Sequence, residues 1–131
     1  MTLIDTRPLD SGPLTWTPAC PRDRMIPGRG AAVLLPTGKQ AAVFLLPDGS
    51  LHAICNIDPS CGAAVLSRGL VGDRSGEPTV ASPLLKQVFS LRTGRCLDDE
   101  ALGVRVYAVR VVDTGVEEAM VQIGAPWTAG S

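Results

Sequence analysis

The chain has 131 residues and a formal net charge of −1, which fits one ordinary domain and is too short for two. Apolar residues make up 45% of the chain and charged residues 19%, so the composition excludes general disorder. With near-neutral charge and 4% aromatic residues, the chain lacks the basic surface and stacking rings that nucleic-acid binding requires.

The two ends of the chain differ in character from its middle. Residues 1–10 carry acids and prolines where a signal peptide would have a basic and then an apolar run, and no apolar run is long enough to span a bilayer. We therefore expect a cytoplasmic protein that makes no membrane contact. We expect one domain over residues 1–131, with its core at about 14–123 and with tails at 1–10 and 124–131.

Short apolar runs dominate the first half. Residues 31–35 and 41–46 are such runs, and the turn-forming cluster 36–39 separates them. Asp48 and Gly49 then stand before a third run, 51–55, and an Asp-Gly pair between apolar runs predicts a β-hairpin. Three consecutive antiparallel strands are therefore expected here.

The second half predicts further strands after a long excursion, residues 56–88. Residues 61–70 are expected to hold a short turn of helix. Strands are expected over 79–81, 88–91 and 104–112, and a turn at 113–115 leads to a last strand over 116–123. The 14 glycines and 11 prolines are spread along the chain, as in an all-β domain with many turns. The sequence predicts a small antiparallel β sandwich or barrel of about eight to ten strands.

Residues that could carry chemistry are few. His52, the single histidine, lies within an apolar strand, where it is either a solvent-facing strand residue or a catalytic base. His52, Cys55 and Cys61 together suggest a zinc site only weakly, because the other two cysteines are isolated; the alternative is that all four are buried, inert thiols. Two disulfides are the other arrangement of four cysteines. The acidic run 98–100 is either a solvated loop or a hard-cation site.

Four segments of the second half resemble a Rieske-type ferredoxin domain: 55–59, 65–70, 80–89 and 93–97. The resemblance implies an all-β Rieske-type fold with a smaller, loop-rich subdomain. In that family two loops each present one cysteine and one histidine to a 2Fe-2S cluster. The matching positions here are Asn56 and Asp58 in the first loop and Ser82 and Leu85 in the second, so all four ligands are replaced.

The pattern is closest to one group of this superfamily, the small subunits of assimilatory NAD(P)H-dependent nitrite reductases. That resemblance covers about residues 14–123; it departs at Ser60, where an aromatic residue is expected, and at Leu85, where a polar residue is common. It implies a large partner subunit carrying FAD, a 4Fe-4S cluster and sirohaem, which reduces nitrite to ammonium. This chain would hold no cofactor, would not be catalytic alone, and would act in assembly or stabilisation.

Two other functions remain open. The chain could be an electron carrier whose iron is held by Cys55, Cys61 and Asp58, or a free-standing protein-binding β module.

The two loops also supply the residues expected to contact a partner. Asp58 and Pro59 form either a simple turn or a partner contact. Arg68, Lys86 and Gln87 are expected to form a polar rim around an apolar centre of Leu84 and Leu85. Val88 and Phe89 are expected in the core.

Overall fold

Strands make up nearly all the regular structure of the computed structural model, which describes residues 2–6, 14–84 and 87–126. Two short 3-10 helices, η1 (Arg22–Arg24) and η2 (Leu66–Arg68), lie between strands. The strands are β1 (Thr2–Thr6), β2 (Leu14–Pro21), β3 (Gly30–Leu34), β4 (Gln40–Leu45), β5 (Leu51–Cys55), β6 (Leu70–Arg74), β7 (Glu77–Ala81), β8 (Val88–Ser90), β9 (Val106–Asp113) and β10 (Met120–Pro126).

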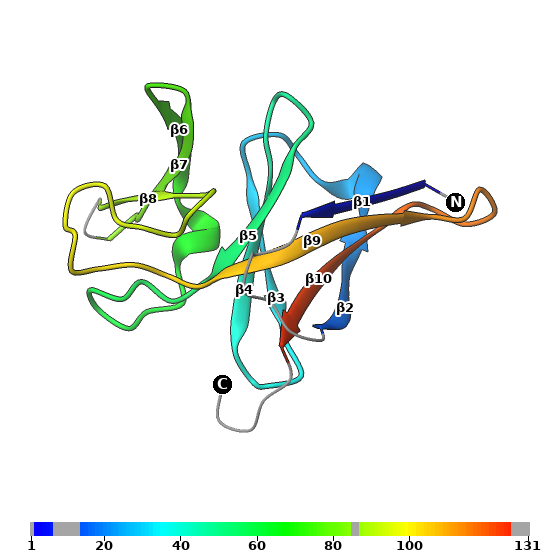
Figure 1. The fold of residues 1–131 in the computed structure, drawn as a ribbon, viewed down its shortest axis with the longest axis horizontal. Helices are drawn as coiled ribbons and strands as arrows, with labels where there is room; N and C mark the ends of the chain where they lie inside the picture. The colour runs from blue at the N-terminus through cyan, green and yellow to red at the C-terminus, as the bar shows by residue number, and fades with distance from the viewer. Residues whose placement is uncertain (1, 7–13, 85–86, 127–131) are drawn as a thin grey trace.

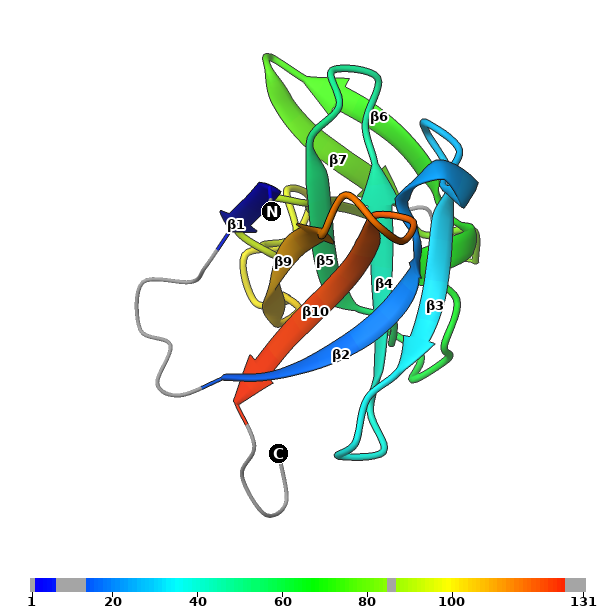
Figure 2. The same cartoon turned by 90° about the vertical axis from the view of Figure 1, so that its right-hand side faces the viewer.

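Seven strands form one antiparallel sheet that curls on itself, as Figure 2 shows. Its order is β2-β10-β9-β5-β4-β3, and β1 pairs with β9 beside this path. The β9 strand is central because its first residues pair with β5 while its later residues pair with both β10 and β1. The curl encloses a barrel core whose largest fully buried side chains include Val43, Val109 and Ile123.

A second, smaller sheet lies against one side of the first (Figure 1). It consists of β6, β7 and β8 in that order. Between the two sheets lies an interlayer core that includes Phe44, Leu66, Val80 and Phe89, all with 0% exposed surface. This small sheet and its loops are the long excursion that the sequence predicts after residue 55.

The β4 strand connects the two layers because it is buried on both faces. Ala41, Val43 and Leu45 point into the barrel core, while Ala42 and Phe44 point into the interlayer core. Successive side chains of a strand face opposite sides of its sheet, so a strand covered on both sides needs an unbroken apolar run. That requirement explains the sequence of residues 41–46.

The predicted fold class, all-β and antiparallel, is confirmed, and so is the meander of three strands in the first half. The turn of helix expected within 61–70 is present as η2. Phe89 is in the core as predicted, whereas Val88 is half-buried.

Several boundaries predicted from the sequence were wrong. Residues 2–6 form β1 rather than a tail, and β10 continues through Pro126, so residues 124–126 belong to the sheet. Residues 7–10 and 127–131 lie outside the described part. Besides β1, two further strands, β2 and β6, were not predicted, and residues 104–105 and 116–119 lie outside strands. Among the described residues, no helix is long and apolar enough to cross a membrane.

Candidate functional site

The loops that follow β5 and β7 meet at one end of the molecule, and we call residues 56–63 and 82–87 together the loop tip. Asp58, Pro59 and the residues after them form a tight turn: the Asp58 carbonyl accepts the Gly62 N–H at 2.7 Å, and its carboxylate Oδ1 accepts the Ser60 N–H at 2.9 Å. Gly62 has a φ of 76°, a left-handed conformation that favours glycine. The turn interpretation of this segment is confirmed.

Three of the four positions that match cluster ligands lie in the interior. Asn56 and Ser82 are 1% exposed, and Asp58 is 0% exposed. The Ser82 Oγ donates to the Asp58 Oδ2 at 2.5 Å, which joins the two loops directly. A second bond, from the Ser60 hydroxyl to the Gln87 side-chain carbonyl, lies beside it. Leu85 and Lys86 lie outside the described residues.

Asn56 connects the first loop to other elements. Its side-chain amide donates to the Gln40 Oε1 at 3.1 Å, and its Oδ1 accepts the Ser67 N–H at 2.7 Å. Its backbone carbonyl accepts the N–H groups of Val65 and Leu66, both at 3.1 Å. Asn56 therefore fixes η2 against β4, and both ends of its side chain are in use.

This donor set does not fit a Rieske cluster. Such a cluster needs two thiolates and two imidazoles, whereas these positions supply an amide, a carboxylate and a hydroxyl, and leucine at 85 has no donor atom. Each buried side-chain nitrogen or oxygen in the described part already has a hydrogen-bond partner. No group of three His, Cys, Asp or Glu side chains that could hold a metal occurs within residues 2–6, 14–84 and 87–126.

His52 and the four cysteines, all within the described residues, do not form a metal-binding group, although Cys61 belongs to the loop tip. All four cysteines are free thiols, as predicted, but burial is uneven: Cys96 is buried, Cys20 and Cys55 are half-buried, and Cys61 is exposed. The prediction that all four are buried was therefore wrong. Burial raises the pKa of the Cys20 thiol, which keeps it protonated.

His52 lies near the other end of β5 from Asn56. Its ring is half-buried beside the Ser50 Oγ, 3.3 Å away, and it lines a cavity that is open to solvent. The solvent-facing position predicted for it is met in part. The acidic residues 98–100 are exposed, as expected of a solvated loop. Asp98 connects this loop to the small sheet, because its carboxylate accepts the Val88 N–H and pairs with Arg74 at 3.2 Å. Both contacts lower the pKa of its carboxyl.

The residues expected to contact a partner divide by exposure. Pro59 and Arg68 are exposed, Leu84 is 55% exposed, and Gln87 is half-buried. The prediction that Asp58 contacts a partner was wrong. Its carboxylate is enclosed and turned toward Ser82, so it shapes the loop and offers no surface to a partner. The hydrogen bonds through Gln40, Ser60 and Ser67 had no signal in the sequence, because they join residues up to 27 positions apart.

A small cavity of about 240 Å³ adjoins the loop tip. Cys55, Ile57 and Pro59 line it, and Lys39 and Arg105 bring two positive charges to its lining. Burial and the neighbouring Cys55 raise the pKa of the Tyr107 hydroxyl, so this group remains neutral. The first loop is thus bordered by cationic side chains.

Known proteins with similar sequences and structures were found in three comparisons. Residues 15–119 match the family described as "Rieske-like [2Fe-2S] domain". The chain is 44% identical over 103 residues to the nitrite reductase (NADH) small subunit of Salmonella typhimurium, which covers 78% of this chain and 94% of that protein. It is 41% identical over 96 residues to a nitrite reductase NAD(P)H large subunit of Klebsiella oxytoca, which covers 73% of this chain and 10% of that one.

A solved structure of a similarly named protein has a similar fold. A Mycobacterium tuberculosis protein assigned as the small subunit of an NADH-dependent nitrite reductase superposes with a TM-score of 0.82 at 50% identity. The superposition covers 89% of this chain and 100% of that chain.

Proposed function

The chain belongs to the family of Rieske-like 2Fe-2S domains, in its nitrite reductase small-subunit branch, and we propose that it serves that enzyme as an accessory chain without a cluster of its own. The proposed partner is the large subunit, which would carry FAD, a 4Fe-4S cluster and sirohaem and would reduce nitrite to ammonium in nitrate assimilation. In this proposal the small chain assists assembly or stability of the complex.

One observation carries the proposal of a cluster-free chain. The three described positions that match cluster ligands are occupied by Asn56, Asp58 and Ser82, whose side chains are buried and bonded to protein groups. A hydroxyl bonded to a carboxylate holds the two loops together at the place where the family holds iron. The loops therefore keep their arrangement through contacts within the chain.

The Klebsiella relative supports the choice of partner. There, a chain named as a large subunit contains a segment matching 73% of this protein. A domain that is covalently joined to the large subunit in one organism works at high effective concentration beside it. We propose that the same contact forms between separate chains here. We also propose a cytoplasmic location, because the four free thiols suit a reducing compartment.

The proposed contact surface is the exposed part of the loop tip. Pro59 and Leu84 provide apolar area, Gln87 lies beside Ser60, and we include Arg68, Leu85 and Lys86 in the proposal from their sequence positions. An apolar centre with a polar rim is the usual composition of a contact between separate chains. The cations Lys39 and Arg105 extend this surface on the side of Cys55.

The test is co-expression of the chain with its large subunit, followed by purification of the complex and measurement of NADH-dependent nitrite reduction. Leu84→Asp should weaken association by about tenfold or more, because it places a charge in the apolar centre. The matched control is Val116→Asp, since Val116 is 90% exposed in the loop between β9 and β10, away from the loop tip. Equal association of both variants with the large subunit would reject this surface.

The cluster-free proposal is tested separately on the isolated chain purified without oxygen. Iron, acid-labile sulfide and visible absorption should all be absent. About two irons and two sulfides per chain would mean a cluster and would replace the accessory role with electron transfer.

A further inference from the structure

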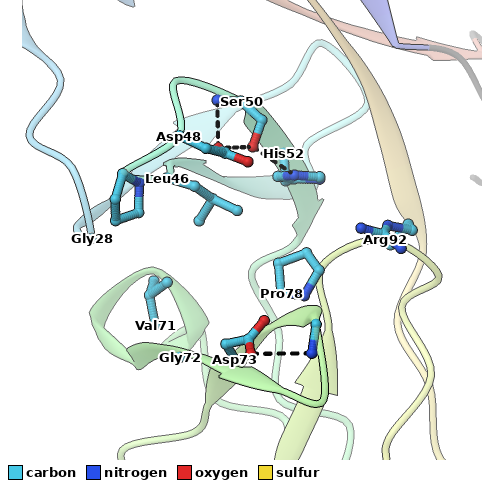
Figure 3. A pocket seen from close by; sticks show the side chains of 12 residues that line it. Gly28, Leu46, Asp48, Ser50, His52, Val71, Gly72, Asp73, Pro78 and Arg92 are labelled. Carbon is cyan, nitrogen blue, oxygen red and sulfur yellow. Dashed lines mark hydrogen bonds between the residues drawn. The ribbon is translucent and has the colours of Figure 1, made fainter.

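A cavity lies between the tips of two hairpins, at the end of the molecule away from the loop tip. The β4–β5 hairpin supplies one wall and the β6–β7 hairpin supplies the other, as Figure 3 shows. The cavity has a volume of about 590 Å³, and we call it the hairpin cleft. Cavities of about 300–1,000 Å³ are typical of small-molecule sites in proteins.

The floor of the hairpin cleft is apolar. Leu46 belongs to the interlayer core, Val71 packs against that core, and Pro78 also lines the cleft. The two layers separate here and leave apolar side chains facing an open space. Gly28 and Gly76 border the cleft, and a Cβ atom at either position would meet nothing within 4 Å. An apolar group of a ligand would therefore find both area and room.

The rim carries side chains of both charges, but they differ in whether they already have hydrogen-bond partners within the chain. The carboxylate of Asp48 accepts the N–H of Ser50 at 2.9 Å and its hydroxyl at 2.6 Å. The carboxylate of Asp73 accepts the Gly76 N–H at 3.1 Å. Within the described residues, no hydrogen bond or ion pair engages the guanidinium of Arg92. Both carboxylates thus use acceptor atoms within their own turns and keep their negative charges, whereas the donors of the Arg92 guanidinium have no partner among the described residues.

The pKa of His52 is affected by the charge of Arg92. Burial lowers the pKa of its imidazole below the usual 6.5, and the positive charge of Arg92 lowers it further, with a larger effect than the opposing one of Asp48. The Ser50 Oγ, which donates to Asp48, also lies 3.3 Å from the His52 Nε2 and helps to position the ring. An anion placed beside Arg92 would be attracted by the guanidinium and would meet its N–H donors.

We propose that the hairpin cleft binds a carboxylate that is attached to an apolar body. The carboxylate lies between Arg92 and His52, and the apolar body lies on Leu46, Val71 and Pro78. A planar guanidinium matches the two oxygens of a carboxylate. Because the two walls come from different sheets, a bound ligand contacts both layers of the molecule.

The test is a titration of the full chain, labelled with ¹⁵N, followed by NMR. The first probe is 3-phenylpropionate, and its matched control is 3-phenylpropionamide, which has the same apolar body without the charge. We expect saturable shifts at cleft residues with the acid and a Kd about tenfold or more weaker with the amide. We also expect the acid to raise the pKa of His52, which is unambiguous because the chain has one histidine.

Arg92→Gln should weaken binding of 3-phenylpropionate by about tenfold or more. Arg95→Gln is the matched control, because Arg95 is an exposed arginine three positions further along the same loop and does not line the cleft. Unchanged spectra outside the cleft will show that both variants are folded. Binding that is equal for the acid and the amide, or unaffected by Arg92→Gln, would overturn the proposal.

A carboxylate of this kind can come from a small organic acid or from the C-terminus of a polypeptide. N-acetyl-Gly-Phe with a free carboxylate, compared with its amidated form, separates these sources. Binding of the peptide acid at least as tight as that of 3-phenylpropionate supports a polypeptide ligand, and binding of 3-phenylpropionate alone supports a small acid. Failure of both acids to bind at millimolar concentration would overturn the site.

Discussion

At the scale of single residues, the buried carboxylate of Asp58 is the most demanding group in the molecule. A carboxylate removed from water is costly unless hydrogen bonds satisfy it. Here the Ser82 hydroxyl and the Ser60 N–H supply those bonds, one to each oxygen. The stability of the loop tip therefore depends on a few specific donors.

Ser82→Ala removes the donor to Asp58 Oδ2 and leaves that oxygen buried without a partner. We expect the free energy of unfolding to fall by about 2–3 kcal/mol, because bonds to charged groups are strong and an unpaired buried acceptor is costly. Urea denaturation of the variant and the parent chain measures this difference.

The control for Ser82→Ala is Ser50→Ala, which removes a hydroxyl bonded to the exposed Asp48. Since water can replace that donor, we expect a loss of about 0.5 kcal/mol or less. Similar losses in both variants would contradict the special role of the buried pair.

The site residues were only partly readable from the sequence. The resemblance placed Asn56, Asp58 and Ser82 at corresponding positions of two loops, and the structure brings Asp58 and Ser82 into contact. Their burial could not be predicted from the sequence, because no pattern in the neighbouring residues indicates that a polar side chain is enclosed by a distant loop. The contacts of Gln40 and Gln87 were missed for the same reason: their partners are 16 and 27 residues away.

At the scale of elements, a strand was predictable where its own residues determine its environment. The β4 strand is apolar throughout since both faces are buried, and the Asp48-Gly49 turn after it is a strong local signal. The β6 strand has mostly exposed residues at a sheet edge, so no apolar pattern marks it. The β2 strand contains Pro18 and Pro21 and pairs through a register shift at residues 121 and 122 of β10. Prolines of that kind are tolerated at edges and bulges but hide a strand from sequence reading.

The β6–β7 hairpin carries local backbone strain. Ser75 has a φ of 53° in its turn, the one positive value among the described residues other than glycine. A non-glycine side chain in this left-handed conformation costs about 1–2 kcal/mol, and replacing it with glycine removes that cost. Glycine also has greater freedom in the unfolded chain, which offsets part of the stabilisation.

We therefore expect Ser75→Gly to raise the free energy of unfolding by about 0.5–1 kcal/mol. Thermal unfolding followed by circular dichroism measures the change. Gly76→Ala provides the opposite case, because Gly76 has a φ of 87°, and it should lower stability. A loss of stability in Ser75→Gly would mean that the Ser75 side chain contributes more than its backbone strain costs.

At the scale of the whole molecule, the two cores are not independent. Alternate side chains of β4 belong to the barrel core and to the interlayer core, and the chain crosses between the layers through residues 56–69 and again through residues 91–105. Neither layer can lose its packing without exposing one face of that strand. How the two layers pack on each other depends on contacts between residues far apart in the sequence. The sequence therefore indicated an excursion after residue 55 but not where that excursion packs in the fold.

We expect both layers to unfold in one cooperative step. Native-state hydrogen exchange of amides in β7 and in β10 should give the same free energy of opening, and Phe44→Leu should lower both values equally. A smaller opening free energy for β7 alone would show that the small sheet separates while the large sheet remains folded.

The bond between Ser82 and Asp58 also bears on how the protein matures. A metal cluster must be built and delivered before it can hold two loops together, and metal-dependent domains remain unfinished when the metal is scarce. A hydroxyl and a carboxylate of the same chain meet as soon as the chain folds. In the proposed cluster-free role, the loops of this protein reach their final arrangement directly after synthesis, independently of the iron supply of the cell and of any assembly machinery.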